Sequence, residues 1–155
     1  MRISMVSVGT KMPGWVQAGV DEYVKRIQSS LGFSLTEIPL AQRTKSSNIS
    51  QCMQKEAEGI LARIQSNDYV ITLEVAGIHY STEQIAERIA EFKTDGRNVV
   101  FLAGGPDGLN ESCKVRANEK WSLSKLTLPH PLVRILLVEQ LYRANSILEG
   151  HPYHR

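Results

Sequence analysis

The chain has 155 residues, of which 42% are hydrophobic and 22% are charged, and its formal net charge at pH 7 is +2. This length fits one domain, residues 1–155, because two separate domains would each have too small a core. No apolar run approaches the roughly 20 residues of a membrane-spanning helix, so we expect no transmembrane segment. The small net charge permits nucleic acid as a partner without requiring it.

The N-terminal segment Met1–Val8 is interrupted by polar residues and is followed by no small-residue cleavage site, so it predicts a first strand and not a signal peptide. We therefore expect a cytoplasmic protein. The only two cysteines, Cys52 and Cys113, each lie in a helical pattern. In a reducing compartment such residues are usually buried thiols, and we do not expect a disulfide.

The first part of the chain predicts a strand over Arg2–Val8 and then a helix that starts at Pro13. A second strand follows over Phe33–Ile38. The next segment, Leu40–Ser47, is a polar loop in which Arg43 and Lys45 could contact phosphate, although loops of this kind are more often simply solvated. The first helix is expected to direct six residues inward: Trp15, Val16, Val20, Tyr23, Val24 and Ile27.

The middle of the chain continues the alternation of helices and strands. The elements predicted here are a helix capped by Ser47 or Asn48 and running to about Ile64, a buried strand Tyr69–Leu73 turned at Ala76–Gly77, a helix that starts with a capping box of Ser81 and Gln84 and is broken at Asp95–Gly96, a strand Val99–Leu102, and a short helix Asn110–Asn118.

The segment Trp121–Leu128 predicts a strand or extended loop, after which two prolines favour a helix start near Pro131. Apolar residues at helical spacing form a continuous stripe as far as Leu148. Four further apolar residues lie off this stripe, which implies a second burying surface, and a second copy of the chain would supply it. These residues are Ile135, Leu136, Val138 and Tyr142.

Strands that alternate with helices along the whole chain predict an α/β fold, a parallel sheet covered by helices on both faces. Ligands of such sheets bind beyond the carboxyl ends of the strands. The first turn, Gly9–Gly14, has neither a Lys-Ser/Thr pair nor the G-x-G-x-x-G pattern, so it is not expected to bind a nucleotide. The loop Ala103–Gly108, with sequence AGGPDG, is the better candidate, because its glycines let the main chain approach a ligand. A tight turn alone would also explain it.

Three histidines, His130, His151 and His154, could be considered as metal ligands. None has acidic or cysteine partners nearby in the sequence, and we expect no metal site. No pattern of a Ser/His/Asp or Cys/His hydrolase is present either.

Four blocks of the sequence together resemble a known family: VGTKMPGWV, FLAGGPDGL, WSLSKLTLPHPLVRILLVEQLYRA and the closing HPYHR. In this order and spacing they are similar to the bacterial large-subunit ribosomal RNA pseudouridine N3-methyltransferases of the SPOUT class. The resemblance covers essentially the full length. It implies a C-terminal trefoil knot, a homodimer, and S-adenosyl-L-methionine bound in a bent form by the knot loops. Chain-pattern reasoning would not propose a knot, since true knots are rare.

The resemblance also implies site residues. Those expected to bind the cofactor are Leu73, which would otherwise be read as core, Gly104, Gly105, Leu123, Ser124, Lys125, Leu126, Thr127 and Leu128. Those expected to bind the substrate nucleotide are Arg134, Arg143, Tyr153, His154 and Arg155. Arginine can pair with phosphate, and Tyr or His can stack on an extruded base. Without the resemblance, the two helix arginines would be read as a solvated face.

The implied activity is methylation of N3 of a pseudouridine on the assembled ribosome. The imide proton of the target nitrogen must leave, so we expect His154 to act as the base and Arg155 and Arg143 to stabilise negative charge on the ring. The C-terminal tail would then close over the RNA, or else pack on its own subunit. Two other classes remain: a non-catalytic ribosome-binding or assembly factor, and a flavin or nucleotide oxidoreductase.

Overall fold

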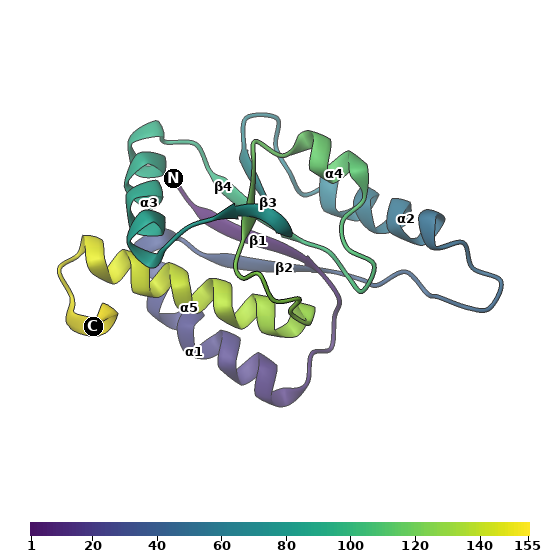
Figure 1. The fold of residues 1–155 in the computed structure, drawn as a ribbon, viewed down its shortest axis with the longest axis horizontal. Coiled ribbons are helices and arrows are strands. Elements are labelled where there is room, and N and C mark those ends of the chain that lie inside the picture. Colours follow the sequence, from purple (N-terminus) through teal and green to yellow (C-terminus); the bar gives the residue numbers. More distant parts are fainter.

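The computed structural model describes residues 1–155 and contains one five-stranded, entirely parallel sheet flanked by helices (Figure 1). The strand order is β2-β1-β4-β3-β5. The elements along the chain are β1 Ile3–Val8, α1 Gly14–Leu31, β2 Ser34–Ile38, α2 Ile49–Leu61, β3 Tyr69–His79, α3 Thr82–Asp95, β4 Val99–Ala103, α4 Glu111–Arg116, β5 Glu119–Ser122, α5 His130–Leu148 and a 3-10 turn Pro152–His154.

The helices form two layers, which confirms the predicted parallel sheet with both faces covered. In Figure 1, α1, α3 and α5 lie on one face of the sheet, and α2 and α4 lie on the other. Alternate residues of each strand serve the two layers: Ile3 and Met5 of β1 belong to the core under α1, α3 and α5, whereas Val6 and Val8 belong to the core under α2 and α4. None of the helices has both the length and the apolar content that a membrane crossing requires.

The helix boundaries follow the local signals. The Asn48 side chain caps α2 by accepting from the Ser50 amide at 2.8 Å. Ser81 and Gln84 form the predicted capping box of α3, and Gly96 ends that helix in a left-handed conformation. Cys52 and Cys113 are buried free thiols, as predicted.

Two expectations about individual residues are wrong. Trp15 does not face the core, because the buried stripe of α1 runs through Val16 and Val20, and a residue about 100° away from Val16 around the helix falls outside it. The Trp15 side chain is 62% exposed. The interior therefore uses a narrower face of α1 than the pattern indicated.

The second wrong expectation is the turn at Ala76–Gly77, because β3 continues through these residues to His79. Leu73 and Ile78 both pair with Trp121 of β5, so the segment between them bulges out of the ladder. Gly77 allows this close approach, since a Cβ there would lie 2.5 Å from the carbonyl carbon of Trp121. The bulge carries residues 74–76 toward the carboxyl edge of the sheet.

Most of the apolar residues that lie off the main stripe of α5 are covered within the same chain. Helix α5 lies between α1 and α3 (Figure 1). Val138 is fully buried, and Ile135 packs against Gly19 of α1. Leu136 is the most exposed member of this group, with 38% of its surface accessible to solvent. The second burying surface inferred from the sequence is thus mainly supplied by α1 and α3.

Candidate active site

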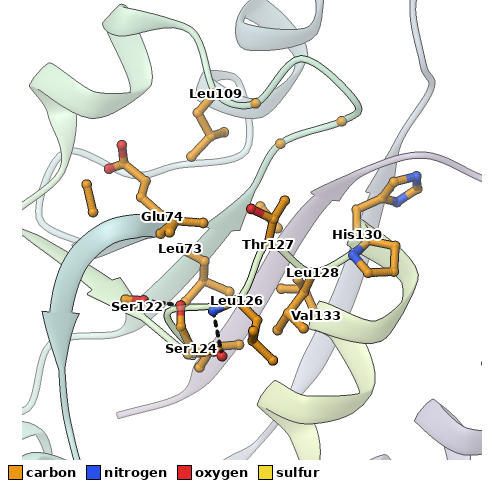
Figure 2. A pocket seen from close by; sticks show the side chains of 18 of the residues that line it. Leu73, Glu74, Leu109, Ser122, Ser124, Leu126, Thr127, Leu128, His130 and Val133 are labelled. Carbon is orange, nitrogen blue, oxygen red and sulfur yellow. Dashed lines mark hydrogen bonds between the residues drawn. The ribbon is translucent and has the colours of Figure 1, made fainter.

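A cavity of about 690 Å³ opens at the carboxyl edge of the sheet, where segments from three parts of the chain meet (Figure 2). One wall is the bulged end of β3, a second is the loop after β4, and the third is the segment from the end of β5 to the first turn of α5. The lining residues are Leu73–Ala76, Ala103–Pro106, Gly108, Leu109, Lys114, Ser122–Ser124, Leu126–His130 and Val133. This is the edge at which parallel sheets bind ligands.

The loop Ala103–Gly108 is folded tightly on itself. Gly105 and Gly108 form a β-bridge, and the Gly108 amide donates to the Gly105 carbonyl at 3.0 Å. A Cβ on Gly104 would lie 2.4 Å from the carbonyl carbon of Gly108, a distance that no side chain tolerates. The glycine at this position therefore keeps the loop closed and leaves its main chain accessible to the cavity.

Arg43 anchors this loop to the rest of the protein. Its Nε donates to Asp107 at 2.9 Å, and its Nη1 donates to the buried carboxylate of Glu56 at 2.6 Å. Glu56 also accepts from the Ala41 amide. Arg43 is thus engaged within the chain, and the phosphate contact considered for it is replaced by a structural one.

The segment that follows β5 forms a compact turn along the floor of the cavity (Figure 2). The Ser122 hydroxyl donates to the Ser124 carbonyl at 2.8 Å, and the Leu126 amide donates to the Ser124 hydroxyl at 3.0 Å. Leu126 is 71% exposed at the mouth of the cavity. An apolar side chain held open to solvent beside a cavity is suited to cover a bound ligand.

The C-terminal tail packs on its own subunit. The Tyr153 ring lies against Tyr142 with centroids 4.4 Å apart, and its hydroxyl lies 3.3 Å from Glu139 and 3.5 Å from the Tyr23 hydroxyl. The Arg143 guanidinium lies over the same ring, 4.8 Å from its centroid. Burial and the contact with Tyr23 raise the pKa of Tyr153, so this phenol stays protonated at neutral pH.

The orientation of the His154 ring follows from its contact with the main chain. Its Nδ1 lies 2.8 Å from the His151 carbonyl oxygen. A carbonyl can only accept, so Nδ1 carries the proton and Nε2 keeps its lone pair when the ring is neutral. The Arg155 side chain is exposed.

The cavity and the tail lie at opposite ends of α5. His130, in the first turn, lines the cavity, whereas the tail follows the last turn at Leu148. Eighteen steps of about 1.5 Å separate these residues by roughly 27 Å along the axis. Within one chain, the cavity and the tail therefore do not form a single site.

A family model described as "Predicted SPOUT methyltransferase" matches residues 1–154. The chain belongs to the SPOUT methyltransferase family. Three relatives carry the name "Ribosomal RNA large subunit methyltransferase H": proteins of Saccharophagus degradans at 53% identity, Hahella chejuensis at 51% and Marinomonas sp. at 48%. Each similarity covers 100% of this chain and 99% or more of the relative.

In this SPOUT methyltransferase, every residue expected to bind the cofactor lines the cavity except Lys125, whose side chain is exposed. The fold thus brings together Leu73, the glycine loop and the Leu123–Leu128 segment. The substrate residues divide into two groups. Arg143, Tyr153, His154 and Arg155 gather at the far end of α5, while Arg134 lies near its start.

Arg134 is fully enclosed, with 1% of its side chain exposed. Its Nη1 donates to Glu37 at 2.6 Å, and its Nη2 donates to the Gly9 carbonyl at 2.7 Å. These contacts tie α5 to the ends of β1 and β2. In this structure Arg134 has no surface on which a substrate phosphate could bind.

None of the three titratable residues that line the cavity, Glu74, Lys114 and His130, was placed at the site from the sequence. His130 was considered only as a metal ligand. Burial, together with the positive charge of Arg134, lowers the pKa of His130 below its ordinary value of 6.5, so the ring is neutral at about pH 7. Its buried Nδ1 has no hydrogen-bond partner. The one available signal for Glu74 was its position directly after Leu73.

Proposed function

We propose that this SPOUT methyltransferase transfers a methyl group from S-adenosyl-L-methionine to N3 of a pseudouridine in large-subunit ribosomal RNA, acting on the assembled ribosome in the cytoplasm. The observation that carries the proposal is the convergence of the three predicted cofactor segments on one cavity. The shared name of the three full-length relatives supports ribosomal RNA as the substrate class.

The cavity fits the cofactor. Its volume of about 690 Å³ lies within the range of small-molecule sites, roughly 300–1,000 Å³. Leu73, Leu109, Leu126 and Leu128 offer apolar surface for an adenine ring, and the Gly104–Gly105 main chain offers polar groups at close range. When bound, the cofactor supplies an activated methyl group. The residues of the chain would hold it and exclude water around it.

We further propose a homodimer in which the tail of one copy completes the site of the other. In support, Leu136 is exposed on α5 and lies six residues from both His130 and Tyr142. If a two-fold axis passes near Leu136, the two α5 helices run antiparallel. Tyr142 of one copy, and the tail that packs on it, would then lie beside the cavity of the second copy. Within one chain, Tyr142 is 12 residues from His130, or roughly 18 Å along the helix axis, and this antiparallel arrangement removes that separation. The trefoil knot stays a prediction of the resemblance.

In this arrangement His154 is the base that takes the imide proton, because its neutral form, with Nδ1 engaged by the His151 carbonyl, keeps a lone pair on Nε2. Arg155 and Arg143 stabilise the negative charge that develops on the ring oxygens. Tyr153 stacks on the extruded base, or holds Arg143 in place through its ring. Placing the acceptor nitrogen in line with the methyl group supplies the rest of the acceleration.

The experiment that tests this function is methyl transfer from labelled S-adenosylmethionine to three substrates: stripped ribosomal RNA, isolated large subunits and complete ribosomes. We expect incorporation into complete ribosomes above all, and mass spectrometry of nuclease digests should place the methyl group on N3 of a pseudouridine. The cofactor should also raise the melting temperature, as a ligand that binds only the folded state must.

The alternative is a non-catalytic ribosome-binding or assembly factor, in which the glycine loop is only a turn. Absence of methyl transfer to all three substrates, with no melting shift from S-adenosylmethionine or S-adenosylhomocysteine, would favour this alternative. An oxidoreductase, the third class considered, predicts flavin colour or affinity for a nicotinamide nucleotide, and both are measured with the same preparation.

A further inference from the structure

One end of the cavity carries a pair of opposite charges that none of the roles described so far uses. Glu74 extends from the bulge of β3, and Lys114 extends from α4, the helix that follows the glycine loop. Both line the cavity, and the Lys114 Nζ lies 3.3 Å from Glu74 Oε1. In Figure 2 the Glu74 carboxylate lies at the opposite side of the cavity from His130.

The carboxylate of Glu74 is held in a defined position. The Thr72 hydroxyl, itself fully buried, donates to Glu74 Oε2 at 2.6 Å. The bulge between Leu73 and Ile78 places Glu74 at the cavity edge, because a regular ladder would pair this segment with β5. Only 15% of the Glu74 side chain is exposed, so its charge is weakly screened by water.

The remaining lining of the cavity is apolar or main chain, apart from two serine hydroxyls, one threonine hydroxyl and His130. The neutral ring of His130 offers no fixed charge. The pair Glu74–Lys114 is thus the one place on the cavity wall that offers charges of both signs, which a zwitterionic ligand group requires. S-adenosylmethionine has such a group, since the ammonium and the carboxylate of its amino-acid end are attached to the same carbon.

We propose that Glu74 and Lys114 bind the amino-acid end of the cofactor, with the Glu74 carboxylate accepting from the ammonium and the Lys114 ammonium donating to the carboxylate. This inference rests on the proposed use of S-adenosylmethionine. It makes the pair a determinant of specificity: ligands with the amino acid bind tightly, and nucleosides without it lose these charge-assisted hydrogen bonds. The adenine then lies toward Leu123–Leu128.

The test is calorimetry with three thioether ligands that differ in this end: S-adenosylhomocysteine, decarboxylated S-adenosylhomocysteine, which keeps the ammonium, and methylthioadenosine, which has neither group. For Glu74→Gln we expect affinity for the first two to fall by at least about tenfold while affinity for methylthioadenosine changes less than about twofold. For Lys114→Met we expect weaker binding of S-adenosylhomocysteine alone.

The matched control is Glu111→Gln, which removes a carboxylate from α4 without touching the cavity lining. Melting curves without ligand check that each variant folds. If Glu74→Gln does not fold, Lys114→Met still tests the role of the pair. Equal losses for all three ligands would show that the pair only maintains the cavity, and unchanged affinities would also overturn the inference. A wild-type protein that binds none of the three ligands would overturn the proposed function itself.

Discussion

At Gly104 the main chain of the glycine loop is in close contact with the main chain of Gly108. Adding a single methyl group at Gly104 should therefore force the closed loop to open. A Cβ there would meet the Gly108 carbonyl carbon at 2.4 Å, and backbone cannot move aside without opening the turn. For Gly104→Ala we predict that affinity for S-adenosylhomocysteine falls by at least about tenfold, or roughly 1.4 kcal/mol. Titration calorimetry measures this.

Gly105 provides the matched comparison. A Cβ at Gly105 would approach the ends of two side chains, Val8 at 3.1 Å and Leu40 at 3.2 Å, and both can shift by a few tenths of an ångström. Gly105→Ala should therefore cost less affinity than Gly104→Ala. If the two variants lose affinity equally, the closed form of the loop does not control binding.

At the scale of elements, the tail and α5 form one unit. Deleting Tyr153–Arg155 removes the ring contact with Tyr142, and such aromatic pairs contribute about 0.5–1.5 kcal/mol. We predict a melting temperature lower by a few degrees, because about 1 kcal/mol corresponds to roughly 2–4 °C at this size. Cofactor affinity should be unchanged, since no residue of the tail lines the cavity. Methylation of ribosomes should fall by at least about tenfold.

Single substitutions separate the contributions of the tail. Tyr153→Phe keeps the ring against Tyr142 and should restore most of the stability, while His154→Ala should lower single-turnover methylation without a melting shift. Full methylation by the truncated protein would remove the tail from the site, and Arg143 would then be the main candidate for holding the substrate.

For the whole molecule, the decisive question is which face joins two copies. Leu136→Asp would place a charge at the centre of the proposed contact along α5, so we predict monomers by sedimentation and loss of methylation. Val115→Asp is the matched control, because Val115 is 77% exposed on α4, in the opposite layer of the sheet. If the dimer persists in Leu136→Asp but dissociates in Val115→Asp, the interface lies on the α4 face and not along α5.

The sequence by itself determined the order and type of nearly all elements. Their signals are local: a capping box between Ser81 and Gln84, a proline before a helix, or an alternating strand pattern depends on residues within a few positions of each other. The same kind of reasoning identified AGGPDG as the loop to examine, because glycine chemistry is visible in a short segment.

Only the tertiary structure decided which segments meet. Arg134 donates to the Gly9 carbonyl across 125 positions of the chain, and this contact, not its place on a helix face, makes it a buried structural residue. The bulge of β3 exists because two of its residues pair with Trp121, a register that no pattern within β3 predicts. The tail and the cavity were expected in one site, yet α5 holds them apart, because the rise of a helix fixes the distance between its ends.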